Sequence, residues 1–327
     1  MENVTIREAT LEDKNEVVDI RDDVYDGRDY IISRYDELIT CPDTTAYIAF
    51  KNGKAVSFVA VTYIDAGKTV VTRAGRSSKS VTGQYINKYI IKQALIKAQQ
   101  QGVIIRAFTT GNTPSSVDSE EYRLRNKMIL SKKIIRFLVD TTSLPVNSHI
   151  VKNKLRKPDD NEINSYFENE NTRRYLFPKE RLICSWVPYK LHSSNFPHMR
   201  RPQENKRIFS DVTVDDDGRV TGLFSLSSTF QCIDPTYLTD LDIHGTDVTS
   251  LKNHVLSHFN FVRTIVNGVV SVLIFIEHGF DMVKLKKVLE EIGLSESPWY
   301  LNNDPNIPLY TEQRLYESII QSLLANL

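Results

Sequence analysis

Short alternating segments dominate the first third of the chain and predict a sheet. Val4–Arg7 alternates apolar and polar side chains, which is typical of a half-buried strand. Segments 46–50, 55–64 and 69–74 are also strand-like, and Asn52-Gly53 between the first two favours a tight hairpin. The pattern therefore predicts three consecutive antiparallel strands after the opening strand.

Helical periodicity fills the spaces between the strands. Thr10 begins a capping-box pattern, and Tyr30–Leu38 is typical of a second short helix. A longer helix is predicted from about Ser80 to Gln101 and ends at Gly102, a residue suited to the position after a helix. A helical crossover joins parallel strands, so the apolar strand 103–108 should lie parallel to an earlier one.

The second half of the chain follows a similar order more loosely. The remaining predicted elements are helix 119–124, strands 129–139, 207–213, 219–227 and 237–243, helix 247–261, strand 269–276, helix 281–292 and strand 309–315. These elements predict an α/β (α+β) protein with a mixed, mostly antiparallel sheet flanked by helices. We expect one domain at 1–140, a linker at 141–148, and a C-terminal α/β domain at 149–327 that is a diverged structural repeat.

Composition narrows the class of protein. Lys plus Arg and Asp plus Glu both total 41, so the net charge of zero gives no reason to expect nucleic-acid or membrane binding. The N-terminus carries no signal-peptide pattern, and the three cysteines form no metal or disulfide motif, which predicts a cytoplasmic protein without a metal. His254 and His258 lie four residues apart on a predicted helix, and we interpret them as a surface pair.

The loop 75–84 is the first candidate for chemistry. It joins an apolar strand to a helix, and helix N-termini in that position often bind phosphate through backbone N–H groups. Arg76 and Lys79 add positive charge, and Thr82-Gly83 is expected in the first helical turn. The plain alternative is a solvated connection, and no dinucleotide or Walker motif is present.

A cluster of tyrosines and acids is the second candidate. Its members, Tyr25, Asp29, Tyr30 and Tyr35, could line a polar pocket for a small cationic or amphoteric substrate. The alternative is a tyrosine-rich packing corner. Tyr122 could protonate a leaving thiolate, or it could be an aromatic residue on a helix surface.

Several stretches, in a conserved order along the chain, carry a resemblance to a known family. They are Tyr25-Asp26-Gly27-Arg28-Asp29-Tyr30, Ser33-Arg34-Tyr35, Tyr63-Ile64-Asp65-Ala66-Gly67-Lys68-Thr69-Val70, Trp186-Val187-Pro188-Tyr189, Ser194-Asn195, Tyr237-Leu238-Thr239-Asp240-Leu241-Asp242, Gly245 and Tyr310-Thr311-Glu312-Gln313. Together with the order of elements, they resemble the GNAT superfamily of acyl-CoA N-acyltransferases. Within it, the chain is similar to the histidine N-acetyltransferases and their probable N-acetyltransferase relatives.

The resemblance implies an acetyl-CoA site where the fourth strand splays from the fifth. The family's phosphate-binding pattern, Arg/Gln-x-x-Gly-x-Gly/Ala, falls on 82–87, and this chain departs from it at Thr82, Tyr85 and Asn87. Relatives carry a glutamate base where this chain has Arg73. The implied cofactor-binding residues are Thr72, Arg73, Arg76, Lys79, Thr82, Gly83 and Gln84.

The expected function is acetyl-CoA-dependent N-acetylation of a small amino acid or amine, histidine-like, by direct attack on the thioester. A backbone N–H beside Thr72 and Arg73 would hold the oxyanion, Tyr122 would protonate the thiolate, and Asp29 would hold the acceptor's cation. Because the loop departs from the pattern, a catalytically inactive GNAT-fold binding protein is the alternative. A third possibility is another acyl donor bound by Arg73, Arg76 and Lys79; the sequence does not indicate the oligomeric state.

Overall fold

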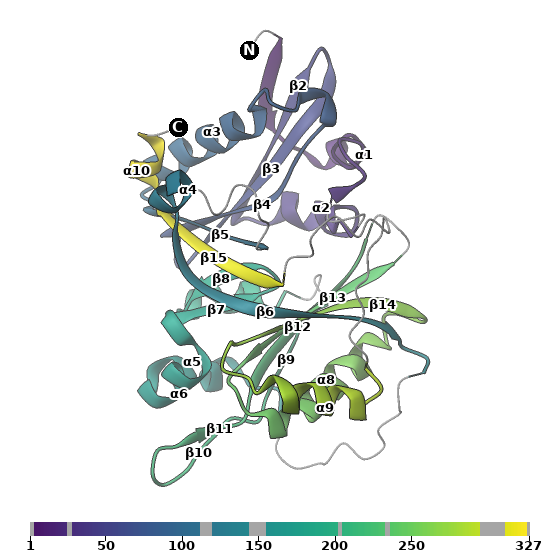
Figure 1. Ribbon diagram of the computed structural model, residues 1–327. Coiled ribbons are helices and arrows are strands. Elements are labelled where there is room, and N and C mark those ends of the chain that lie inside the picture. Colours follow the sequence, from purple (N-terminus) through teal and green to yellow (C-terminus); the bar gives the residue numbers. More distant parts are fainter. Residues whose placement is uncertain are drawn as a thin grey trace.

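One long sheet organises the protein. The computed structural model describes residues 3–24, 28–111, 120–143, 155–201, 205–232, 236–294 and 311–325. Within them, eleven strands form a continuous sheet in the order β1-β2-β3-β4-β5-β15-β6-β14-β13-β12-β9, and β7–β8 and β10–β11 form two small hairpins. The first half of the sheet lies above the second in Figure 1, and both termini lie at the upper end.

The strands are β1 (Val4–Glu8), β2 (Thr44–Lys51), β3 (Lys54–Ile64), β4 (Thr69–Ser77), β5 (Ile105–Gly111), β6 (Lys127–Asp140), β7 (Arg181–Cys184), β8 (Val187–Lys190), β9 (Arg207–Ser210), β10 (Thr213–Val214), β11 (Val220–Thr221), β12 (Phe224–Gln231), β13 (Tyr237–His244), β14 (Val269–Ile276) and β15 (Glu312–Ile319). The α-helices are α1 (Lys14–Val18), α2 (Ile31–Thr40), α3 (Ile86–Gln100), α4 (Glu120–Arg125), α5 (Asp160–Glu168), α6 (Glu170–Leu176), α7 (Phe196–Met199), α8 (Val248–Val262), α9 (Met282–Glu291) and α10 (Ile320–Leu324).

The same arrangement of strands occurs twice. In the first half, β3 and β4 are antiparallel, α3 crosses over, and β5 returns parallel to β4. In the second half, β12 and β13 are antiparallel, α8 crosses over, and β14 returns parallel to β13. The two arrangements agree with the order of the predicted elements, and the structural duplication itself stays a prediction.

Strand β6 belongs to both halves. Residues Lys127–Lys133 pair with β15, and residues Lys133–Asp140 pair with β14. Strand β15, from the C-terminal end, lies between β5 and β6, so the last part of the chain completes the first half of the sheet. The predicted division at 141–148 stays a prediction, but each half takes a strand from the other side of that boundary.

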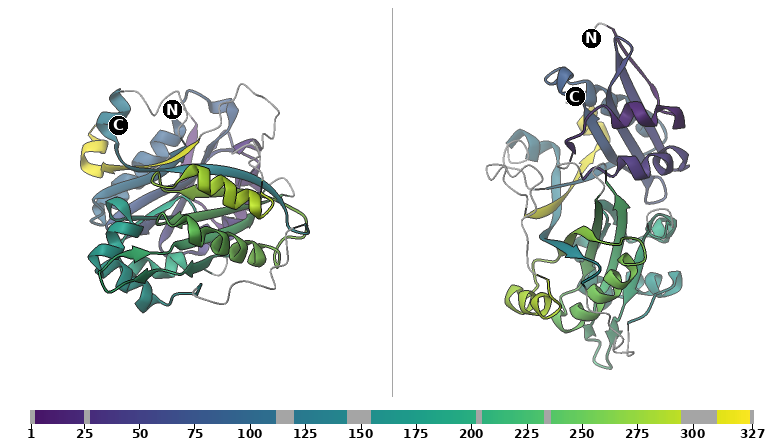
Figure 2. Two further views of the ribbon diagram at one scale, coloured as in Figure 1. Left: turned by 60° about the horizontal axis from the view of Figure 1, so that its bottom comes forward. Right: turned by 90° about the vertical axis from the view of Figure 1, so that its right-hand side faces the viewer.

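Helices cover the sheet on both faces. In the first half, α3 packs on one face and α1 with α2 on the other. In the second half, α8 and α9 cover one face, while α5, α6 and the β7–β8 hairpin cover the opposite side (Figure 2). These helices present apolar residues at helical spacing to the sheet, which is the usual reason that such helices form.

Most predicted elements are present, and their ends differ where the backbone is irregular. Strand β4 continues to Ser77 instead of ending at Ala74, because a bulge at Ala74 bends the strand without stopping it. Helix α3 begins at Ile86, so the expectation that Thr82-Gly83 forms its first turn is wrong. The predicted last strand, 309–315, is shifted to β15, and residues 309–310 lie outside the described residues.

Substitution of Leu315 tests how β15, a strand from the C-terminal end, packs in the first half of the sheet. Its side chain is buried in a hydrophobic core that contains residues of both halves. Leu315→Ala should lower the free energy of unfolding by about 2–5 kcal/mol, because it would leave a void in that core. Ile319→Ala, on the same strand but exposed, should change it by about 0.5 kcal/mol or less. Urea denaturation followed by circular dichroism measures both. Equal effects of the two substitutions would contradict the packing described for β15.

Candidate active site

A cavity opens where β4 and β5 separate. The two strands pair only from Thr69 to Val71 and from Ile105 to Ala107, and beyond these residues they diverge. The cavity there has a volume of about 570 Å³. It is lined by residues 72–75 and 108–111 of these strands, and also by parts of β7–β8, β12, β13 and β14. Both halves of the protein therefore contribute to one cavity, which is large enough for a small-molecule site.

The bulge on β4 shapes the cavity wall. The pairing of β3 with β4 shifts between Phe58 and Ala60, and Ala74 adopts a left-handed φ of 53°. The N–H of Ala74 donates a hydrogen bond of 2.9 Å to the hydroxyl of Tyr30. Gly75, the next residue, lies beside Asn87 in the first turn of α3, and Ile91 from the following turn of that helix lines the cavity. Tyr85 precedes this helix and makes no side-chain cap.

The second half contributes a carboxylate to the same cavity. Asp240 on β13 lines it together with Ser185 and Trp186 of the β7–β8 turn. The Ser185 hydroxyl donates to Asp240 Oδ2 at 2.8 Å, and the Ser185 N–H donates to Asp242 Oδ2 at 2.8 Å. Desolvation, followed by repulsion from Asp242, raises the pKa of Asp240 to about 7.

Two arginines from the first half lie at this end of the cavity. Arg28 Nε donates to Ser271 of β14 at 3.1 Å, and an Arg34 guanidinium N–H donates to Ser228 of β12 at 3.1 Å. Both line the cavity, and Arg34 lies close enough to Asp240 to lower its pKa in part. The site thus holds a carboxylate from one half and two guanidinium groups from the other.

Comparison with known proteins agrees with this architecture. Residues 151–277 match the family described as "Histidine N-acetyltransferase, C-terminal". The Histidine N-acetyltransferase of Oreochromis niloticus is 23% identical over 286 residues, which cover 82% of each chain. The Probable N-acetyltransferase 16 of Homo sapiens is 24% identical over 203 residues, or 57% of this chain and 54% of that protein.

Among solved structures, a tandem GNAT protein from the clavulanic acid biosynthesis pathway covers 97% of this chain and 98% of its own, at 11% identity and a TM-score of 0.55. The chain has the GNAT fold. N-myristoyltransferase of Saccharomyces cerevisiae, with bound myristoyl-CoA, has a TM-score of 0.52 at 12% identity and covers 97% of this chain and 83% of its own. The predicted fold class and the resemblance to the histidine N-acetyltransferases are confirmed.

Four of the residues predicted for the site of this GNAT-fold protein line the cavity: Tyr30, Thr72, Arg73 and Tyr122. The Thr72 hydroxyl accepts a hydrogen bond of 3.3 Å from Arg106, which spans the point where β4 and β5 separate. Tyr122 packs edge-on against Phe108 and Tyr316. Burial raises the pKa of Tyr122 to about 12, so this phenol stays protonated at physiological pH and can donate a hydrogen bond.

Asp29 and Arg76 pair with each other and do not line the cavity. Arg76 forms a buried, two-pronged ion pair with Asp29, whose Oδ1 also accepts the N–H of Ile31 at 3.1 Å. The pair ties the start of α2 to β4. This geometry does not support the predicted acceptor contact of Asp29 or the predicted cofactor contact of Arg76, because each charge is already satisfied inside the protein.

The other predicted residues lie away from the cavity. Tyr35 is fully buried, and its hydroxyl donates to the carbonyl of Thr10 at 2.6 Å, so the packing-corner interpretation describes it better than a substrate contact. Tyr25 lies outside the described residues. The loop residues Thr82, Gly83 and Gln84 are exposed near the start of α3.

Two side chains of that loop have partners on the surface. Lys79 forms an ion pair of 2.9 Å with Asp23, and Gln84 accepts a hydrogen bond of 2.7 Å from Lys51. The pKa of Asp23 falls to about 2 through its hydrogen bonds with Arg21 and Lys79. Lys79 is therefore engaged at the edge of the loop and would need to exchange partners to bind a phosphate.

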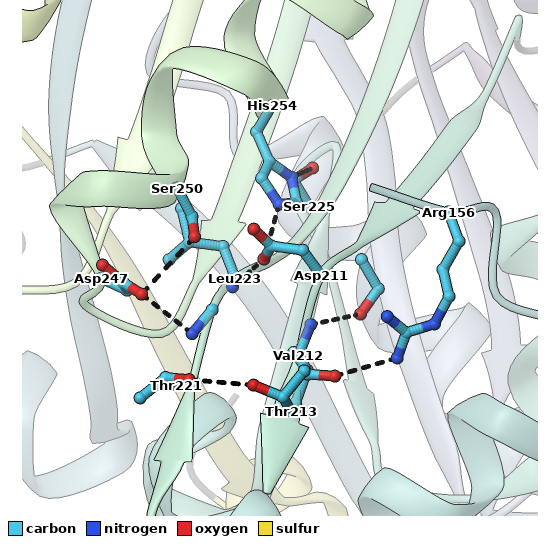
Figure 3. A network of polar contacts seen from close by, with 12 residues as sticks. Arg156, Asp211, Val212, Thr213, Thr221, Leu223, Ser225, Asp247, Ser250 and His254 are labelled. Atoms are coloured by element: carbon cyan, nitrogen blue, oxygen red, sulfur yellow. Dashed lines mark hydrogen bonds and ion pairs between the residues drawn. The ribbon is translucent and has the colours of Figure 1, made fainter. Parts of the chain in front are cut away.

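The interpretation of His254 and His258 as a surface pair is wrong. Both are buried between α8 and β12, where Ser225 bridges them at 2.6 Å and 2.8 Å. Asp211 contacts His254 at 3.2 Å and also accepts the N–H of Leu223 (Figure 3). Burial lowers the pKa of His258 well below its usual value, so it stays neutral. This Asp–His–Ser chain lies outside the cavity described above and serves to join α8 to the sheet.

Sequence analysis missed Asp240, Ser185, Arg28 and Arg34 as site residues. Asp240 and Asp242 interrupt an apolar strand that includes Leu238 and Leu241, and buried acids in such a strand are a usable indication of function. Both acids lie in the second half, whereas the resemblance places the family's base on a strand of the first half. Among the described residues, no group of three or more His, Cys, Asp and Glu side chains could hold a metal. No described helix is long and apolar enough to cross a bilayer.

The ion pair between Asp29 and Arg76 can be tested directly. Asp29→Asn or Arg76→Ala should lower the free energy of unfolding by about 3–5 kcal/mol, because each leaves a buried charge without its partner. The double substitution Asp29→Leu with Arg76→Met should recover most of that loss. Chemical denaturation measures all three. Unchanged stability of Asp29→Asn, with lost ligand binding, would instead support a direct acceptor contact.

Proposed function

We propose that the protein is an acetyl-CoA-dependent N-acetyltransferase that acts on a small amino acid. The observation that carries this proposal is the cavity at the divergence of β4 and β5, which is lined by residues of both halves. The similarity to proteins named Histidine N-acetyltransferase supports the same reaction and a histidine-like acceptor.

The acyl donor fits the open side of this cavity. Between the diverging strands there is room for the thioester, and the bulge brings Gly75 beside the first turn of α3. A helix N-terminus without a side-chain cap favours an anion there, since its first N–H groups point outward. Backbone N–H groups, which any residue supplies, can thus substitute for the residues missing from the family pattern at 82–87. No metal is needed in this proposal.

The acceptor fits the opposite end. An amino acid carries both an ammonium and a carboxylate, and Asp240 with Arg28 and Arg34 provides charges of both signs around one space. Arg34 also lies 5.1 Å from the ring centre of Phe230, which gives the site an apolar and aromatic wall. A free amino acid matches this combination better than a simple amine, which has no group for the two arginines.

The reaction is direct attack of the amine on the thioester carbonyl. Thr72, Arg73 and the bulge residues lie along the wall where the thioester would sit, and a strand N–H there would hold the developing oxyanion. Tyr122 would donate a hydrogen bond to the departing sulfur. Complete proton transfer from a phenol of pKa about 12 to a thiolate is unfavourable, since thiol pKa values are near ~8.5, so solvent completes the protonation.

The proposal that acetyl-CoA binds in the cavity can be tested by placing a larger side chain there. Wild-type protein should bind acetyl-CoA in a calorimetric titration and release free thiol when L-histidine or another amino acid is added. Gly75→Leu should weaken acetyl-CoA binding by tenfold or more, because Gly75 lines the cavity and its backbone tolerates a side chain. Val283→Leu, at an exposed position on α9, is the control and should bind normally.

The outcome also separates the alternatives. Absence of binding at millimolar acetyl-CoA would favour the inactive binding protein. Binding of another acyl-CoA in place of acetyl-CoA would favour a different donor. Arg76→Ala does not distinguish these cases, since loss of the buried pair with Asp29 would disturb the fold.

A further inference from the structure

A strained turn holds Ser185 at the boundary between the halves. The β7–β8 hairpin turns through Ser185 and Trp186, whose φ angles are 47° and 66°. Residues other than glycine are disfavoured in this left-handed region, and such strain persists where surrounding contacts hold it. Here Ser185 binds Asp240 and Asp242, and the carbonyl of Trp186 accepts a hydrogen bond from Thr109 of β5. The turn is therefore anchored to both halves at the cavity.

Asp240 occupies the middle of the sheet face that closes the cavity. Its neighbours across the sheet are Ser228 on β12 and Leu273 on β14, and Leu273 also lines the cavity. Asp240 is almost fully buried; Oδ2 accepts the Ser185 hydroxyl, and Oδ1 accepts no hydrogen bond from the residues that the structure describes. A buried carboxylate oxygen without a donor is costly unless a ligand or water supplies one.

Burial and the charges around Asp240 bring the pKa of its carboxyl group close to physiological pH. Its pKa of about 7 results first from burial and then from repulsion by Asp242, while Ser185, Arg34 and the Trp186 side chain lower it in part. Asp242 in turn faces Lys132 of β6 at 3.8 Å, and Glu277 contacts the same lysine at 3.7 Å. The other charged groups that line the cavity are Arg28 and Arg73. A carboxyl group poised in this range is well matched to accept a proton at physiological pH.

We infer that Asp240, oriented by Ser185, is the proton acceptor for the attacking amine. The inference rests on the proposed acetyl transfer and adds a catalytic residue to it. It also explains how the reaction proceeds with Arg73 on β4, because the base comes from β13 of the second half. Ser185 is a positioning residue, since it acts on Asp240 through the hydrogen bond to Oδ2.

The proton balance is simple. The acceptor's ammonium gives one proton to the Asp240 carboxylate, and the neutral nitrogen attacks the thioester carbonyl carbon to form the C–N bond. The intermediate collapses, the C–S bond breaks, and the sulfur leaves with the electron pair. The remaining extra N–H proton passes through solvent to the thiolate. Asp240 then returns its proton to water, so the turnover releases the amide, the free thiol and one proton.

Asp240→Asn tests the catalytic role. The substitution keeps the shape and removes the base, so kcat/KM should fall about 10²- to 10⁴-fold, while acetyl-CoA binding should stay within threefold of wild type. In the wild type, kcat/KM should rise with pH through about 7 as Asp240 loses its proton, and this limb should disappear in the variant. Glu291→Gln, which removes a surface carboxylate on α9, is the matched control and should behave as wild type.

Ser185→Ala tests the positioning role. The Ser185 hydrogen bond lowers the pKa of Asp240, so its removal should move the limb of the pH profile to higher pH. Loss of a purely structural contact would reduce activity equally at all pH values. If Asp240→Asn does not fold, the pH profile of Ser185→Ala tests the role of Asp240 instead.

Stability gives an independent readout of Asp240. Its folded pKa lies above the unfolded value of about 3.9, so its favourable contribution is present below pH ~4 and is lost as the pH rises through about 7. Asp240→Asn should therefore raise the Tm at pH 8 relative to wild type, and raise it less at pH 5. A Tm that falls equally at both values would assign Asp240 a structural role.

The outcomes distinguish this inference from the proposed function. Acetyl transfer by Asp240→Asn at near wild-type rate, with the same pH profile, would overturn the role of Asp240 and leave the N-acetyltransferase proposal intact. Absence of transfer by the wild-type protein with every amino acid tested would overturn both.

Discussion

The sharing of β6 between two half-sheets is the constraint on which the rest of the structure depends. One end of this strand pairs with β15 and the other with β14, so the two halves form one continuous hydrogen-bonded sheet. Ladders of this kind resist shear, since sliding one half would break many backbone hydrogen bonds together. Residues of β13 and of the β7–β8 turn can for this reason be held in a fixed relation to β4 and β5. A cavity built from both halves requires such a relation.

A second contact between the halves lies at the β3–β4 turn. Asp65 accepts hydrogen bonds from the side chain of Asn195 at 2.8 Å and from the N–H of Lys190 at 2.9 Å, and the Asp65 N–H donates to Asn195 at 2.9 Å. Asp65 and Asn195 belong to two of the stretches that resemble the histidine N-acetyltransferases. Their geometry gives that resemblance a structural meaning, because they dock the second half onto the turn that begins β4. These contacts hold the start of β4, and the ion pair between Arg76 and Asp29 holds its other end.

The sequence predicted the fold better than the site, for identifiable physical reasons. Asn52-Gly53 and the apolar periodicity of α3 are local features, and they indicated the hairpin and the helix correctly. The exchange of β15 depends on contacts between residues some 180 or more positions apart, such as Glu317 with Lys127, and no local pattern encodes it. The turn at Ser185 and Trp186 was missed because residues with positive φ are expected to be glycine or asparagine.

The same limit applies to the candidate site. Tyr30, Thr72, Arg73 and Tyr122 were found because they belong to the first half, where the resemblance directs attention. Asp29 was a reasonable choice as an acid within a tyrosine-rich segment, but its partner Arg76 lies 47 residues away and neutralises it. Whether a charge serves a ligand or another side chain depends on long-range packing, which charge and spacing alone do not reveal.

The departures at 82–87 and at Arg73 led to the alternative of an inactive binding protein, and the second half bears on that alternative. A protein without chemistry would gain stability by replacing Asp240 with an apolar residue, and by relaxing the Ser185–Trp186 turn with glycine. Instead, the chain keeps a buried acid of raised pKa, a strained turn and two arginines around one space. Features that cost stability and converge on a cavity are expected where function requires them. The arrangement also makes Arg73 compatible with acyl transfer, because a cation on β4 opposes the reaction only if the base must come from β4 itself.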